Sequence, residues 1–226
     1  DDVTEHMVVA NMHAYVLIFT TLGKVFWQRV YEIPEGSKTA KGRAIQNLIN
    51  ILPDDSVRAV INVKNLEDVD YVNNNFLVMC TQKGTIKKTS LEAYSRPRQN
   101  GINAITINEG DRLLNVCLTD GNKDIVIAVQ SGRAIRFHES QVRPMGRVAM
   151  GVRGIRLDDD DYVVAMVCCT QDTTLLSVTE NGFGKRTGLD EYKVQKRGGK
   201  GLINYRITQK TGCVAGSKVV EEEDEL

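Results

Sequence analysis

The residues best suited to chemistry form one short run near the end of the chain. The run combines three glycines and three cations with one neutral donor: Gln195, Lys196, Arg197, Gly198, Gly199, Lys200 and Gly201. Glycines allow a sharp turn and close approach to another molecule, and successive backbone amides in such a turn can form an anion-binding nest. Nothing in the run reads bases uniquely, so it is typical of a phosphate contact that positions a polyanion without specifying sequence. A plain flexible basic loop is the alternative.

Other arrangements that could carry catalysis or bind a metal do not occur in the sequence. There is no GxSxG, HExxH or P-loop pattern. The five cysteines form no CxxC pair, and the three histidines do not lie at zinc-ligand spacing. The acidic run Asp158–Asp161 lacks the interleaved spacing of a calcium loop and is typical of solvated acids. We therefore expect no catalytic residue, no cofactor and no metal site.

The composition predicts a reduced, cytosolic protein. Each cysteine lies in or beside an apolar run, as buried thiols do, and no stretch of the 226 residues approaches the length of a membrane span. The N-terminus has no signal-peptide pattern and no initiator Met, so we expect a segment excised from a longer protein. The length suits one large all-β domain or two small ones.

An internal repeat supplies the elements that must position the basic run. Four segments each contain an apolar run, a glycine, a basic strand, an irregular stretch and a second glycine. The two glycines are separated by 19, 17, 19 and 19 residues. The apolar runs are 14–19, 76–80, 125–129 and 175–178; the first glycines are Gly23, Gly84, Gly132 and Gly182; the second are Gly42, Gly101, Gly151 and Gly201. The approximate repeats are 4–65, 72–122, 123–171 and 172–226.

The repeat predicts an all-β fold of about four blades. The first glycine of each unit is typical of a β-hairpin turn, because it supplies positive φ without steric cost. Small sheets of this kind bury their faces only by stacking on neighbours, which favours a blade architecture. A single β-sandwich with chance glycines is the alternative, and the matched glycine spacing argues against it.

Charge is segregated although the net charge is zero. The segments 23–43, 83–98, 132–156 and 182–201 contain 22 of the 29 Lys and Arg residues and only six acids, a net charge of +16. Acids cluster elsewhere, in Asp158–Asp161 and Glu221–Glu225. Equivalent segments of a repeat fold lie on one rim, so we expect a basic band for a polyanion, with the acids displaced to other edges. Charged residues that merely solvate a surface are the alternative.

One position in each unit is expected to point outwards toward that ligand, because side chains alternate along a strand. It is the fourth residue after the first glycine, and basic neighbours precede it in two units. The residues are Lys88, Arg136 and Arg186, and Lys87 and Lys185 directly precede two of them. Arg133, which follows the first glycine of its unit, is a further expected DNA contact. Trp27 occupies the position in the first unit and breaks the rule, and Arg29 is expected to substitute there.

Three motifs resemble one family. GxxxR…GVRGIRL in 132–157, NGFGKRT in 181–187 and QKRGGKG in 195–201 are similar to sequences of the C-terminal DNA-wrapping domain of DNA gyrase A subunits. The last motif differs by one residue, Lys196, from the heptapeptide called the gyrase A box. The resemblance covers essentially the whole chain. The first two motifs are shared with the corresponding subunit of topoisomerase IV.

The resemblance implies a β-pinwheel, a propeller-like disc whose blades exchange strands and whose basic perimeter wraps double-stranded DNA. It implies a role in ATP-dependent negative supercoiling within a bacterial, cytoplasmic, nucleoid-associated complex of two A and two B subunits. It also implies that ATP hydrolysis, Mg²⁺ and the cleavage tyrosine lie outside this domain. The family disc has five or six blades and its box lies in the first. Here about four units are present and the run lies in the last, so Gln195–Gly201 is either the main box or a second copy.

Together these patterns predict DNA contacts from the heptapeptide and from the strand residues after the first glycines. Two other functions stay open. One is the topoisomerase IV counterpart, which shares the fold but lacks the box and introduces no negative supercoils. The other is a β-propeller that binds proteins, against which the basic bias argues.

Overall fold

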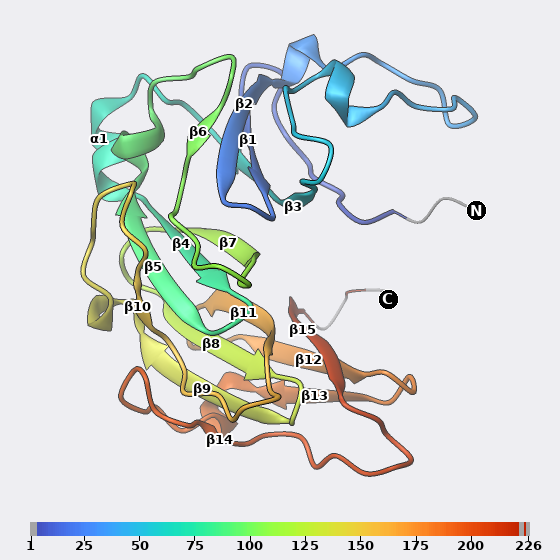
Figure 1. Ribbon diagram of the computed structural model, residues 1–226, viewed down its shortest axis with the longest axis vertical. Coiled ribbons are helices and arrows are strands. Elements are labelled where there is room, and N and C mark those ends of the chain that lie inside the picture. The colour runs from blue at the N-terminus through green and yellow to red at the C-terminus, as the bar shows by residue number, and fades with distance from the viewer. Residues whose placement is uncertain (1–3, 222–223, 225–226) are drawn as a thin grey trace.

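The four apolar runs form the central strands of four antiparallel sheets. The computed structural model describes residues 4–221 and 224. In Figure 1 the sheets follow one another along an arc, and we call them blades 1 to 4 in chain order. Blade 1 is β3 (Val57–Val63), β1 (Tyr15–Thr20), β2 (Lys24–Arg29) and β6 (Ile102–Asn103). Blade 2 is β10 (Val152–Arg153), β5 (Thr85–Ser90), β4 (Phe76–Thr81) and β7 (Leu113–Thr119).

The later blades repeat the same order with one difference. Blade 3 is β11 (Val163–Cys169), β8 (Asp124–Val129), β9 (Arg133–His138) and β14 (Leu202–Ile203). Blade 4 has three strands, β13 (Gly184–Gly188), β12 (Thr174–Thr179) and β15 (Val214–Val220). The predicted all-β pinwheel with four repeated units is confirmed.

Each blade after the first gives a two-residue strand to the blade before it. The chain leaves the second strand of a blade, makes a 3-10 turn and a loop, and then pairs with its predecessor. Thus β6 pairs with β2, β10 with β5 and β14 with β9. The turns are η1 (Val30–Glu32), η3 (Leu91–Tyr94), η4 (Glu139–Gln141) and η5 (Leu189–Glu191), and two further short helices are η2 (Ile45–Asn47) and α1 (Val69–Asn74).

The hairpin glycines allow the exchanged strand to approach closely. Gly132 has a φ of +85°, and a Cβ at this position would collide with the carbonyl oxygen of Tyr205 in the exchanged segment. Gly84 has a φ of +83° and would place a Cβ 2.9 Å from Ile155. The glycine predicted from turn geometry is therefore also required by packing between blades.

Three of the four hydrophobic clusters lie between blades, and the fourth lies within blade 1. One cluster joins Leu17 and Phe19 of blade 1 to Leu77 and Leu113 of blade 2. A second joins blades 2 and 3, and a third joins blades 3 and 4. Each blade therefore depends on its neighbours to cover its apolar faces, as in other repeat proteins. Cys80 and Cys169 are buried in these clusters, and all five cysteines are free thiols.

Candidate nucleic-acid interface

The strand positions predicted to face a ligand are buried between blades instead. Lys87, Lys88 and Arg136 are 0%, 4% and 8% exposed. Lys88 and Arg136 point to the face of their strand that the following blade covers, and Lys87 points to the opposite face, which is also enclosed. The expected outward direction of these three residues is wrong, and we do not include them among the proposed DNA contacts.

Arg136 on β9 joins blade 3 to blade 4. Its Nη1 donates to the carbonyl oxygens of Leu189 (2.7 Å) and Tyr192 (3.1 Å) at the 3-10 turn of blade 4. Its Nη2 and Nε donate to the Asp124 carboxylate at 2.6 and 2.8 Å. Both nitrogens donate to the same carboxylate oxygen, Oδ2, so two charge-assisted hydrogen bonds hold this largely buried charge pair.

Lys88 on β5 joins blade 2 to blade 3 in the same way. Its Nζ donates to the carbonyl oxygen of Glu139 (2.9 Å) and lies 3.5 Å from the carboxylate of the same residue. That carboxylate also accepts from the Thr119 hydroxyl (2.9 Å) and the Lys123 amide (2.8 Å). The side chains of Lys88 and Glu139 are 5% and 0% exposed, so the pair is structural.

Lys87 points to the opposite face of β5 and is likewise enclosed. Its Nζ donates to the carbonyl oxygens of Ala104 (2.7 Å) and Arg147. The Tyr94 hydroxyl also donates to the Ala104 oxygen (2.8 Å). Burial, and secondly the nearby charge of Arg147, lowers the pKa of Lys87 to about 8. Burial raises the pKa of Tyr94 above its usual range.

The lowered pKa of Lys87 predicts a pH dependence of stability. Between pH 8 and the ordinary lysine value of 10.5, the unfolded chain holds a proton that the folded protein has lost. The free energy of unfolding therefore gains from this residue as the pH rises, by at most about 1.4 kcal/mol per pH unit. Urea unfolding of wild type and Lys87→Met from pH 7 to 10 measures this, because other titrating groups are common to both. A constant difference between the two proteins would contradict it.

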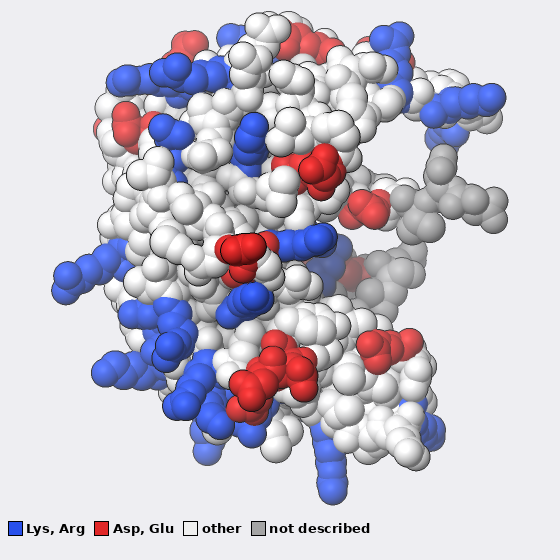
Figure 2. Space-filling model, in the orientation of Figure 1, with Lys and Arg blue, Asp and Glu red and all other residues white. Residues whose placement is uncertain are grey.

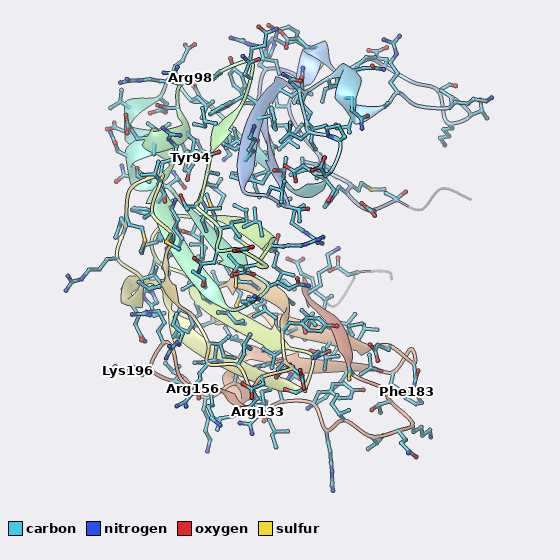
Figure 3. All side chains as sticks on the ribbon, in the orientation of Figure 1. Tyr94, Arg98, Arg133, Arg156, Phe183 and Lys196 are labelled. Atoms are coloured by element: carbon cyan, nitrogen blue, oxygen red, sulfur yellow. The ribbon has the colours of Figure 1, made fainter. Side chains whose placement is uncertain are left out.

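Exposed cations lie instead on the loops and exchanged strands that follow the 3-10 turns. We call this set the basic edge: Arg96, Arg98, Arg143, Arg147, Arg153, Arg156, Lys193, Lys196 and Lys200. All are exposed except Arg147, which is half-buried. Figure 2 shows Lys and Arg gathered along the left margin and lower left of the molecule. Figure 3 places Arg98 on the upper left loop and Lys196 and Arg156 at the lower left.

The basic edge lies on the outer side of the arc. In Figure 1 the loops that carry it lie on the left, whereas β7, β11 and β15 lie toward the inner side. Successive blades supply it: Arg98 follows η3, Arg143 follows η4 and Lys196 follows η5. All nine of these residues belong to the predicted basic segments, but the sequence did not distinguish them from the strand positions. A cation two to five residues after the 3-10 turns η3, η4 and η5 was the available signal.

The heptapeptide Gln195–Gly201 lies in the loop that brings blade 4 back to blade 3. Lys196 and Lys200 are exposed, whereas Arg197 is half-buried and donates to the carbonyl oxygens of Gln141 (3.0 Å) and Arg153 (2.6 Å). Gly201 has a φ of +75°, and a Cβ there would lie 2.7 Å from the Ala134 carbonyl oxygen. Within this run the structure therefore presents the lysines outwards and uses the arginine to hold the loop.

Three backbone amides of the heptapeptide are already used inside the protein, and the first of them, on Gln195, donates to the Arg136 carbonyl at 2.8 Å. The Arg197 amide donates to the side-chain oxygen of Gln141 and the Gly198 amide to the Gly154 carbonyl, each at 2.8 Å. These three amides are therefore not free to form the predicted anion nest. The acidic run Asp158–Asp161 lies closer to the heptapeptide than expected, since Lys200 Nζ is 3.2 Å from the Asp158 carboxylate. Of the second acidic run, Glu221–Glu225, only residues 221 and 224 are described.

The remaining predicted contacts occupy two further places. Arg133, at the start of β9, is half-buried, and Figure 3 shows it at the lower end of the molecule. Lys185 and Arg186 on β13 are exposed, and Lys185 Nζ donates to the Asn204 carbonyl (3.1 Å). The structure thus places Lys196, Lys200 and the loop cations on one edge, and Lys185 and Arg186 on the outermost strand of blade 4.

One known family matches the chain in four segments, which correspond to the four blades. The sequence profile described as DNA gyrase C-terminal domain, beta-propeller, matches residues 14–64, 75–116, 123–170 and 173–212. The chain belongs to this family. The DNA gyrase A protein of Salmonella typhimurium is 39% identical over 226 residues, and that of Clostridium acetobutylicum is 45% identical. These alignments include all of this chain and 25% and 27% of the relatives' lengths.

Solved structures of this gyrase family and of topoisomerase IV share the fold. A DNA topoisomerase IV C-terminal domain matches 93% of this chain with a TM-score of 0.82 and 27% identity. A DNA gyrase A C-terminal domain matches 95% with a TM-score of 0.80 and 25% identity. The chain spans 65% and 68% of those two structures.

The gyrase-family domain has no cluster of metal ligands among its described residues: no group of three or more His, Cys, Asp or Glu side chains is placed to hold an ion. Over the same residues, none of the helices is both long and apolar enough to cross a membrane.

Proposed function

We propose that this domain binds double-stranded DNA along the basic edge and bends it around the outer side of the arc. The main support for this proposal is that loops from blades 2, 3 and 4 each place exposed cations on the same margin of the molecule. A polyanion that follows the margin meets a cation at every blade. The similarity to DNA gyrase A and DNA topoisomerase IV proteins supports DNA as that polyanion, because both kinds of relative are named as enzymes of DNA.

The contacts are to phosphates rather than to bases. The cations reach outwards from loops and two-residue strands, not from a long helix or a two-stranded ribbon of the kind that enters a major groove. Binding of this kind positions a duplex without reading its sequence. Bending 20–30 base pairs by up to 90° costs about 1–6 kcal/mol, and many phosphate contacts can offset that cost.

In the parent protein the domain gives ATP-dependent strand passage its direction. We propose that the parent is the A component of a DNA gyrase, that it works with B subunits in an A2B2 complex in the bacterial cytoplasm, and that the wrapped duplex leads to negative supercoils. The full-coverage match to gyrase A proteins and the heptapeptide favour this assignment over topoisomerase IV. Catalysis is assigned to parts of the complex outside this domain.

A salt series on random duplex DNA tests the proposal. If six cations of the basic edge each neutralise one phosphate, the plot of log affinity against log salt has a slope of about −5. Affinity then falls by about 10³ between 50 and 200 mM salt, and duplexes of different sequence compete equally. Ligation of nicked circles in the presence of the protein reads out bending and wrap direction. A slope near zero, or strong preference for one sequence, would contradict phosphate binding along this edge.

A further inference from the structure

Three sulfur atoms meet where β7 of blade 2 lies against β11 of blade 3. Cys117 Sγ lies 4.0 Å from Met166 Sδ, and Cys168 Sγ lies 3.8 Å from the same atom. The two thiols are also hydrogen-bond partners of each other, and neither belongs to a disulfide. Two thiols from different blades and one thioether therefore surround a single point.

The strands hold the three sulfurs in place. Met166 and Cys168 are two residues apart on β11, so their side chains leave the same face of the strand. Asn115 and Cys117 are likewise two apart on β7. The Asn115 side-chain amide donates to the Met166 carbonyl oxygen (2.9 Å), which fixes β7 against β11 beside the sulfurs. The group is therefore positioned by regular strands and not by a loop.

The separations between the sulfurs suit a three-coordinate metal ion. When three sulfurs surround an ion in one plane with bonds of about 2.3 Å, neighbouring sulfurs stand about 4.0 Å apart. Thiolate and thioether ligands are soft and favour Cu(I). A closed zinc site takes four ligands, and no third His, Cys, Asp or Glu among the described residues joins the two cysteines. The set of two cysteines and one methionine therefore favours Cu(I) over zinc.

The surroundings of the sulfurs allow an ion to enter and then enclose it. Cys117 and Cys168 are half-buried, so solvent reaches this part of the interface, whereas Met166 is fully buried. Both cysteines also pack against the hydrophobic cluster between blades 2 and 3. In Figure 1 β7 and β11 lie toward the inner side of the arc, away from the basic edge. An apolar shell around the metal limits access of water and of competing oxygen ligands.

We propose that Cys117, Cys168 and Met166 bind one Cu(I) ion, which joins blade 2 to blade 3. Each thiol releases one proton as its sulfur binds, and the copper stays in the Cu(I) state, so no oxidant or reductant is needed. The sequence predicted no metal site because it was searched for closely spaced ligands, whereas Met166 is 49 residues from Cys117 in the chain. The site is independent of the DNA path proposed above, since it contains no residue of the basic edge.

Competition for Cu(I) tests the site. The full-length protein, reduced and free of oxygen, is titrated against the coloured Cu(I) complex of bathocuproine disulfonate, which reports the ion that the protein withdraws. Cys117→Ser or Cys168→Ser should weaken binding of one ion at least about 100-fold, because even the loss of an outer partner of a metal ligand costs about 10–100-fold. Met166→Leu, which keeps the apolar volume, should weaken it about tenfold. Cys213→Ser is the matched control, since Cys213 is also a half-buried free thiol, and it should leave the affinity unchanged.

X-ray absorption at the copper edge supplies a second measurement that does not depend on the variants folding. It should give three sulfur neighbours at about 2.3 Å around the bound ion. Circular dichroism identifies any variant that has lost its strands. The site is overturned if wild type and both serine variants withdraw copper equally, or if the bound ion has nitrogen or oxygen neighbours in place of sulfur. Equal affinity of Met166→Leu and wild type would remove the thioether from the site and overturn the three-sulfur assignment.

Discussion

Arg136→Ala is expected to lower the free energy of unfolding by about 3–5 kcal/mol, because it leaves a buried charge without its partner. Asp124 would lose both guanidinium bonds, and the carbonyls of Leu189 and Tyr192 would lose their donor from blade 3. Urea unfolding at neutral pH measures the loss. The sequence alone predicted that Arg136 points outwards and contacts DNA.

Two further variants make the expectation specific. Arg143→Ala removes an exposed arginine from the same blade and should change stability by no more than about 0.5 kcal/mol. In the double variant Arg136→Ala with Asp124→Ala, the cost should be less than the sum of the single costs, since neither charge is then left buried alone. A loss below about 1 kcal/mol for Arg136→Ala would show that Asp124 finds other compensation.

The triple variant Arg98→Ala, Arg143→Ala and Lys196→Ala is expected to weaken DNA binding by about 10²–10³ at 0.1 M salt, as three lost phosphate contacts would. The salt slope should become shallower by about 2.7. One residue is removed from each of blades 2, 3 and 4, and all three side chains are exposed, so the fold should remain intact. Fluorescence anisotropy with a random duplex over a salt series measures both quantities.

A matched charge change elsewhere serves as control. Lys64, Arg112 and Lys218 are exposed and lie just after β3, just before β7 and within β15, away from the basic edge. Their replacement by alanine alters net charge equally, so it should reproduce only the small nonspecific part of the effect. If the two triple variants bind DNA alike, general charge rather than the basic edge attracts the duplex.

The strands could be predicted because each blade repeats a short apolar run, a glycine and a second strand. Phe76–Thr81 and Asp124–Val129 are buried almost throughout, and the predicted runs 76–80 and 125–129 fall inside them. The hairpin glycines fixed where each run ends. Apolar runs and turn glycines are properties of short segments, so they can be recognised from the sequence without knowledge of the fold.

The directions of Lys88 and Arg136 could not be predicted from alternation alone. Alternation assigns a side chain to one face of a strand, and a later blade decides whether that face meets water. Lysine and arginine are mostly exposed, so the expectation followed the general rule. Trp27 at the same position of blade 1 was the contrary signal, since its indole reaches a carbonyl of blade 2. Lys88 and its buried partner Glu139 lie 51 residues apart in the chain, so no local pattern marks them as a pair.

The exchanged strands also fix how far apart the cations of the basic edge stand. Each loop of that edge is anchored where β6, β10 or β14 pairs with the preceding blade, so spreading two loops would break backbone hydrogen bonds. The outer margin therefore keeps a fixed curvature. A DNA duplex that binds along it must bend to match that curvature, so the protein determines the path of the duplex before binding.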